Sequence, residues 1–179
     1  FLSIGNVLVV LSIADYYYAI VLPKNEKDAV ALTHISLLFL LITTILVALS
    51  VLFSTPISMI FKSPNLAKYY WLMPLYVLIM GMWNVLNYWY IRKKSFGRIS
   101  GYQMSQSILS AGGKLGLGYA GVLQGGMIYA TVIAPFIALL SSLLLSFRKT
   151  LRPLLFFSKI DVLTQARVYR NLKVLYLLY

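Results

Sequence analysis

The sequence predicts an all-α polytopic membrane protein with about five transmembrane helices. Of its 179 residues, 60% are hydrophobic and only 11% are charged, against roughly 45–50% and 25% in soluble domains. Runs such as residues 35–53 contain no charged residue, and a helix needs about 20 apolar residues to cross a bilayer. The Lys and Arg residues lie almost wholly between these runs. These three observations exclude a soluble enzyme.

The apolar runs predict five crossings that form one transmembrane unit. The first ends at Pro23, before a short charged loop, and the third has Tyr and Trp at both ends, as is typical of the membrane interfaces. Residues 54–70 carry two prolines and are predicted to form a loop with a short interfacial turn. The fifth crossing contains Pro135. The predicted crossings are residues 1–22, 29–53, 71–91, 99–119 and 121–147.

The segment after the fifth crossing differs in composition from the crossings. Residues 148–173 combine Leu and Phe with many basic residues, which predicts an amphipathic linker lying along the membrane surface. Residues 174–179 are expected to begin a further helix. Because the chain starts with Phe1 inside an apolar run, we interpret it as an internal piece of a longer protein.

The distribution of positive charge predicts the orientation. Thirteen of the 16 Lys and Arg residues follow the first, third and fifth crossings, and cytoplasmic loops are the ones enriched in basic residues. Residues 23–28, 92–98 and 148–173 are therefore expected in the cytoplasm. This placement accounts for the net charge of +12, so we expect no nucleic-acid partner.

The fourth crossing carries a polar stripe. Gln103, Ser107, Ser110 and Lys114 follow one another at i, i+4, i+7 and i+11 on one helix face, and Gln106 borders them. A lysine in the bilayer faces protein or water, so the stripe fits a water-filled path for an anionic solute. The alternative is that Lys114 snorkels to the external surface while the Gln and Ser residues bond neighbouring helices.

Three other polar positions inside the crossings are candidates for a cavity. Asn84 and Asn87 share a face of the third crossing and are expected to line a cavity or to bond a neighbouring helix. Asp15 is the only acid well inside an apolar run; it either pairs with a cation or lies near the cytoplasmic interface. His34 is interpreted as a polar residue near a helix start.

Glycine is concentrated around the fourth crossing. Three pairs have the GxxxG spacing that lets helix backbones approach closely, and the alternative is bending of the fourth and fifth crossings during a transport cycle. The pairs are Gly97 with Gly101, Gly112 with Gly116, and Gly121 with Gly125.

No arrangement of side chains predicts catalysis or cofactor binding. The chain has no cysteine, and its four acids are scattered along the sequence, so neither a metal site nor a catalytic group is expected. The acids are Asp15, Glu26, Asp28 and Asp161.

Three stretches together resemble a known family. They are Ala-Ile-Val-Leu-Pro at 19–23, Val-Leu-Asn-Tyr-Trp at 85–89 leading into the basic turn 92–96, and Gln106 with Leu-Gly-Leu-Gly at 115–118. In this order they are similar to the polysaccharide transporter family, the bacterial flippases of lipid-linked O-antigen and capsule units. That family lies within the superfamily of multidrug, oligosaccharidyl-lipid and polysaccharide exporters, whose fold is MATE-like.

The resemblance implies that residues 1–147 are helices two to six in the N-terminal lobe of a two-lobed, alternating-access transporter of the bacterial inner membrane. The substrate would be an undecaprenyl-diphosphate-linked oligosaccharide, and the polar residues of the third and fourth crossings, together with Asp15, would be its cavity candidates. Membrane lipids and other polysaccharide assembly proteins would be its partners. An ion gradient is expected to drive transport, without a cofactor or a catalytic residue.

The chain departs from the family pattern at three positions. Relatives often carry an acid where this chain has Tyr17, a basic residue where it has Asp15, and an uncharged polar residue where it has Lys114. Two other functions fit the composition: export of organic cations by the same fold, which the scarcity of acids disfavours, and a membrane-embedded enzyme of glycan assembly, which should have a long polar external loop. A scaffold without transport activity would leave the polar stripe unexplained.

Overall fold

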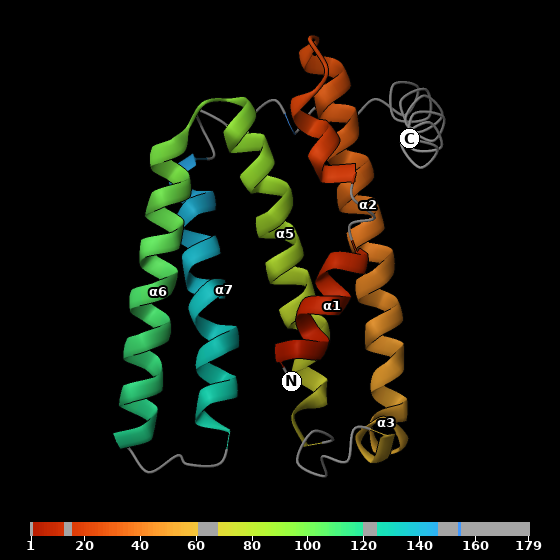
Figure 1. The fold of residues 1–179 in the computed structure, drawn as a ribbon, viewed down its shortest axis with the longest axis vertical. Coiled ribbons are helices and arrows are strands. Elements are labelled where there is room, and N and C mark those ends of the chain that lie inside the picture. Colours follow the sequence, from red (N-terminus) through yellow and green to blue (C-terminus); the bar gives the residue numbers. More distant parts are fainter. Residues whose placement is uncertain (1, 13–15, 61–67, 120–124, 147–153, 155–179) are drawn as a thin grey trace.

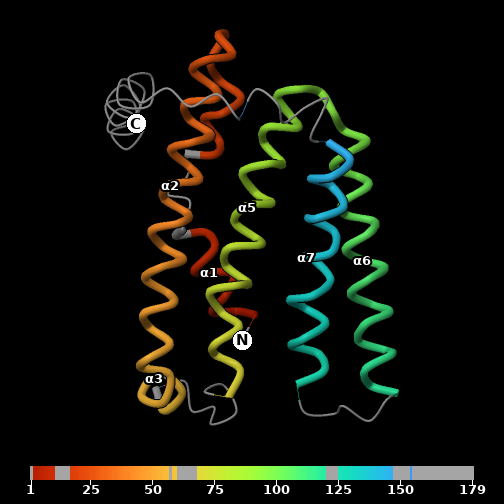
Figure 2. Tube along the Cα trace, turned by 180° about the vertical axis from the view of Figure 1, so that it is seen from behind, coloured from red at the N-terminus to blue at the C-terminus, as the bar shows by residue number. Residues whose placement is uncertain are grey.

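The computed structural model describes residues 2–12, 16–60, 68–119, 125–146 and 154. All regular elements in these ranges are helices. Figure 1 shows α5 in the middle of the bundle, with α1 and α2 on one side and the hairpin of α6 and α7 on the other. The view from behind in Figure 2 has the same arrangement.

In the first predicted crossing, the described residues form one α-helix and one 3₁₀-helix. The structure has α1 (Leu2–Ser12) and the 3₁₀-helix η1 (Tyr16–Val21) in this region. Eleven residues of α-helix rise only about 16 Å, roughly half of the hydrocarbon thickness. Ring contacts attach η1 to α5, since the ring centroid of Tyr88 lies 4.9 Å from that of Tyr17 and 5.0 Å from that of Tyr18.

The second crossing corresponds to α2 (Glu26–Ser50), which begins with two acids, Glu26 and Asp28, in its first turn. Acids at this end of a helix interact favourably with the helix dipole. The helical winding continues through η2 (Val51–Phe53) into α3 (Ser54–Ile60), so the predicted loop at 54–70 starts as a short helix.

The remaining described helices are η3 (Tyr70–Leu72), α5 (Met73–Arg92), α6 (Phe96–Tyr119) and α7 (Gly126–Ser146). They lie over the predicted third, fourth and fifth crossings. The fourth begins three residues earlier than expected, at Phe96, and α7 contains Pro135. Residues 148–173, apart from Leu154, and 174–179 lie outside the described residues.

Two helices have the length and hydropathy of membrane spans. These are the stretch from Glu26 to Pro56, with mean hydropathy 2.8, and α7, with 2.2; only 22% and 39% of their most apolar stretches are buried. The core helix of a soluble protein would be mostly buried, and large exposed apolar surfaces mark contact with a membrane or a partner. The described residues are thus helical, and two of their helices have the length and the exposed apolar surface of membrane spans. The other two long helices, α5 and α6, are less hydropathic. In α5 the cause is its Trp, Tyr and Asn residues, and in α6 its Gln, Ser and Gly residues.

Aromatic side chains join α5 to the hairpin. The rings of Trp83 on α5 and Tyr102 on α6 are stacked, with centroids 3.3 Å apart and planes 12° apart. The Tyr90 hydroxyl lies 3.2 Å from Ser142 Oγ on α7, in a buried hydrogen bond. Since Trp89 and Tyr90 are also fully buried, α5 forms the centre of the core.

Close approaches at glycine are found at positions outside the predicted GxxxG pairs and at one position inside them. A Cβ at Gly81 of α5 would overlap the Leu40 side chain of α2, and one at Gly113 would lie 3.3 Å from Ala130 Cβ of α7. At Gly97, Gly101, Gly112 and Gly116 an added Cβ would meet nothing within 4 Å. GxxxG spacing shows that a face is flat, but not that another helix covers it. In the third pair, Gly121 lies outside the described residues, while Gly125 has a positive φ of 97° and a Cβ there would overlap the Tyr69 side chain.

Two of the three basic segments lie within the described residues, at the same end of the bundle. The loop before α2 and the turn between α5 and α6 are both at the top of Figure 1, where α7 also ends. The C-terminal end of α6 and the start of α7 are at the opposite end, as is α3. This arrangement places residues 23–28 and 92–98 on the same side, as the charge distribution requires.

Candidate polar cavity face and basic cleft

The polar stripe of α6 is largely open. Gln103, Ser107 and Lys114 are exposed, while Gln106 and Ser110 are half-buried. Tyr102 is the only fully buried residue of α6. The described residues therefore leave the stripe uncovered.

An apolar face lies directly beside the stripe. Met104, Ile108 and Leu115 are 65%, 68% and 76% exposed, and each directly follows a stripe residue, which places it about 100° further around the helix. Going round α6, a packed face, an open polar face and an open apolar face follow one another. Such a helix separates a polar from an apolar environment.

The asparagines of α5 are half-buried. Asn87 Oδ1 is buried and has no hydrogen-bond partner among the described residues, and the hydroxyl of Tyr102 is in the same situation. Within the described residues no hydrogen bond links Asn84 or Asn87 to the stripe. The stack of Trp83 on Tyr102 connects the two helices that carry these polar groups.

The other predicted positions divide into three cases. Lys114 lies five residues before the end of α6, about 7.5 Å along the axis, a depth compatible with both of its predicted roles. His34 Nε2 lies 2.9 Å from the Leu154 carbonyl oxygen, so it has a structural contact. Asp15 lies outside the described residues. Among the described residues, no group of three or more His, Cys, Asp and Glu side chains has the arrangement of a metal site.

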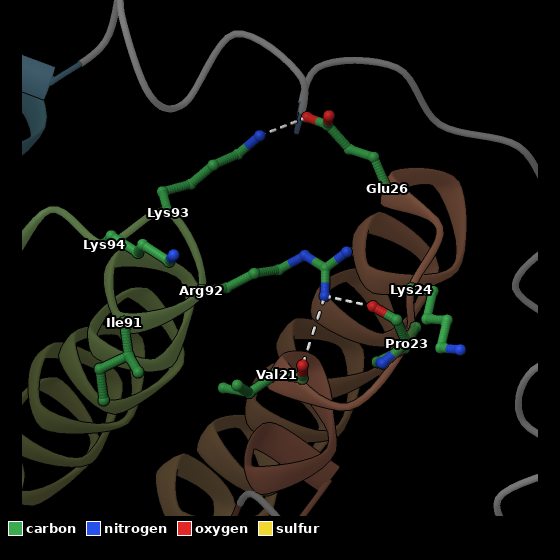
Figure 3. Close-up of a pocket in the computed structure, with 8 residues that line it drawn as sticks. All are labelled: Val21, Pro23, Lys24, Glu26, Ile91, Arg92, Lys93 and Lys94. Carbon is green, nitrogen blue, oxygen red and sulfur yellow. Dashed lines mark hydrogen bonds and ion pairs between the residues drawn. The ribbon is translucent and has the colours of Figure 1, made fainter.

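A second polar feature is a cleft of about 450 Å³ at the end of the bundle that carries the basic segments. It lies between the loop after η1 and the turn after α5, as Figure 3 shows. Four cations and one acid line it, together with apolar side chains. The charged residues are Lys24, Glu26, Arg92, Lys93 and Lys94.

Arg92 reaches across this cleft and holds the loop. Its Nη1 donates to the carbonyl oxygens of Pro23 at 2.6 Å and Ile20 at 3.3 Å, and its Nη2 donates to the Asn25 carbonyl at 3.1 Å. Carbonyls at the end of a helix lack intrahelical partners, and here the guanidinium supplies donors. Neutral acceptors fix the guanidinium without cancelling its charge.

Lys93 forms an ion pair in the cleft, whereas Lys94 does not. Lys93 Nζ lies 2.6 Å from Glu26 Oε1 and 5.3 Å from the centroid of the Trp89 ring. Lys94 adopts a positive φ of 52°, and within the described residues neither it nor Lys24 has an ion-pair partner. The sequence predicted these residues only as markers of orientation, because the run of basic residues gives no sign of a cleft.

Comparison with known proteins identifies the family. A search of curated proteins and a search of solved structures return no match. The family described as polysaccharide biosynthesis protein matches residues 3–166, which is most of the chain and includes every described helix. This match agrees with the resemblance of the residue pattern, and the chain belongs to this family of polysaccharide biosynthesis proteins.

Proposed function

We propose that this chain is part of a flippase that moves lipid-linked oligosaccharides across the bacterial inner membrane by alternating access. Its family places it in polysaccharide biosynthesis. The open polar face of α6 is the observation that carries the proposal, because exposed Gln, Ser and Lys side chains on a membrane-length helix need water or protein against them. We propose that this face lines the transport cavity.

The proposal includes a membrane arrangement of five crossings in the N-terminal lobe of a two-lobed, MATE-like transporter. Support comes from the apolar exposure of α2 and α7 and from the grouping of residues 23–28 and 92–98 at one end of the bundle. We place that end in the cytoplasm, by the rule that cytoplasmic loops are basic.

The chemistry of the polar face suits an undecaprenyl-diphosphate-linked oligosaccharide. A lysine attracts the anionic diphosphate, and amide and hydroxyl groups hydrogen-bond sugar hydroxyls. Moving such a molecule breaks no covalent bond, so we propose no catalytic residue. Gln103, Ser107 and Lys114 are the first candidates for contact; Gln106, Ser110, Asn84, Asn87 and Asp15 are further ones.

Accessibility of introduced cysteines tests the cavity directly. These 179 residues contain no cysteine and therefore give no background labelling. Any cysteines elsewhere in the full-length protein would be removed first. Single cysteines at Gln103 and Ser107 should react with a membrane-impermeant thiol reagent in intact cells. Cysteines at Met104 and Ile108, one residue further along the same helix, are matched controls that should stay unlabelled in lipid. Equal labelling of both pairs would contradict a water-filled cavity at the stripe.

A second experiment tests the transport role of Lys114. Lys114→Ala in the full-length protein should reduce surface polysaccharide while the protein level is unchanged. Lys68→Ala is a control with the same loss of charge, at an exposed position outside α6. Normal export by the Lys114 variant would remove this side chain from the transport site and favour its snorkelling to the external surface.

A further inference from the structure

We propose that the basic cleft between the loop after η1 and the turn after α5 binds the phosphate headgroup of a lipid in the cytoplasmic leaflet. The inference rests on the proposed membrane placement, and it does not depend on transport by the α6 face. The cleft volume of about 450 Å³ is within the range of roughly 300–1,000 Å³ typical of small-ligand sites.

The cleft has an excess of positive charge after its internal pair is counted. Lys93 neutralises Glu26 at 2.6 Å, which leaves Lys24, Arg92 and Lys94 around the same space. Arg92 is a positioning residue, because its hydrogen bonds to the carbonyls of Ile20, Pro23 and Asn25 hold the two walls together. An anion is the ligand that these three charges favour.

The turn that carries Lys94 departs from the usual sequence of such turns. Ser95 N–H donates to the Tyr90 carbonyl at 2.9 Å, and Lys94 N–H donates to the Ile91 carbonyl at 2.9 Å. These two bonds form a Schellman motif, whose left-handed position is usually glycine. A lysine at φ 52° is strained there, and local departures of this kind are expected at functional positions.

The depth of the cleft fits a lipid headgroup. Tyr88, in contact with Tyr17 and Tyr18, lies one helical turn before Arg92, about 6 Å further into the bundle. Tyrosine clusters of this kind lie at the interface between hydrocarbon and headgroups. The cleft is thus on the aqueous side of the tyrosines, where lipid phosphates lie.

The general enrichment of cytoplasmic loops in basic residues explains the presence of these lysines but not their arrangement. Lys27 belongs to the same charged loop, is exposed, and does not line the cleft. If only the overall surface charge mattered, Lys27 and Lys24 would contribute equally to the affinity for an anionic lipid. In a specific site Lys24 would contribute and Lys27 would not, so a comparison of these two lysines distinguishes the explanations.

Lipid binding to the full-length protein tests the proposal. Native mass spectrometry would measure the affinity for phosphatidylglycerol and for undecaprenyl diphosphate, with phosphatidylcholine as the zwitterionic comparison. Lys24→Gln and Lys94→Asn should each weaken binding of an anionic lipid about fivefold, and the double variant by about 25-fold. Asn suits the left-handed conformation at position 94, so the change removes the charge without adding strain.

Two control variants decide the outcome. Lys27→Gln removes one charge at the same end of the bundle and should leave the affinity unchanged; Lys94→Arg should retain it. Losses confined to the cleft variants support the site. If only undecaprenyl diphosphate binding is lost, the ligand is the proposed substrate; if phosphatidylglycerol binding is lost too, the site takes phosphate headgroups in general.

An equal loss with Lys27→Gln, or no loss with any variant, would overturn the proposal. Neither result would affect the thiol labelling of α6, so failure of the lipid site and failure of the transport cavity are distinguishable.

Discussion

The two sides of α5 are packed in different ways. On one side, η1 and α2 are held against it by tyrosine rings, by the close approach at Gly81 and by the hydrogen bonds of Arg92. On the other side, α6 touches α5 chiefly through the stack of Trp83 on Tyr102 and keeps most of its surface open. The difference indicates a fixed half and a half whose open face is available for ligand or for further protein.

The largest expected effect is at the stack that joins the two halves. Trp83→Ala should lower the free energy of unfolding by about 3–5 kcal/mol, because a buried aromatic side chain is replaced by a cavity. A thermal melt of the detergent-solubilised full-length protein would measure the change. Met104→Ala, at an exposed position on α6, should shift stability by less than about 0.5 kcal/mol. Similar effects of the two variants would contradict a stabilising role of the stack.

Glycine substitutions sharpen the contrast in packing. Gly81→Ala should destabilise the protein by about 1–3 kcal/mol, because the added Cβ would overlap Leu40. Gly101→Ala on α6 meets no neighbouring atom and should stabilise the helix by up to about 1 kcal/mol. The same melting experiment applies to both. A destabilising effect of Gly101→Ala would show that another helix covers this face in the full-length protein.

The smallest effect is expected at the turn between the halves. Lys94→Gly should raise the free energy of unfolding by about 1 kcal/mol, because glycine adopts a positive φ without steric cost. Lys93→Gly, at a position with negative φ and an ion pair to Glu26, should lower stability instead. A gain in stability together with weaker lipid binding in Lys94→Gly would mean that the strain is retained for function.

The helix positions were predictable because hydropathy and charge vary over about 20 residues at a time. Runs of apolar residues bounded by basic or aromatic groups located α2, α5, α6 and α7 to within a few residues at most ends. The split of the first segment into α1 and η1 was not predictable in this way. The rings of η1 contact Tyr88, about 70 positions further along the sequence, and a local pattern does not contain such contacts.

The candidate site was predictable only in part, for the same reason. Periodicity placed Gln103, Ser107 and Lys114 on one face of a helix, and the structure leaves that face open. The role of Arg92 depends on four backbone carbonyls in η1 and the loop after it, and a sequence pattern does not show where carbonyl groups point. The lone Gly81 likewise carried no signal, whereas the regularly spaced glycines of α6 did.

The sequence of faces around α6 has a consequence for an amphiphilic cargo. If the polar stripe faces water and Met104, Ile108 and Leu115 face hydrocarbon, the water–lipid boundary runs lengthwise along this helix. A molecule with a charged head and a long isoprenoid tail would keep each part in its preferred solvent while it moves along that boundary. Exposing the tail to water costs about 25 cal/mol for each Å² of apolar surface, and a lengthwise boundary avoids that cost at every depth of the membrane.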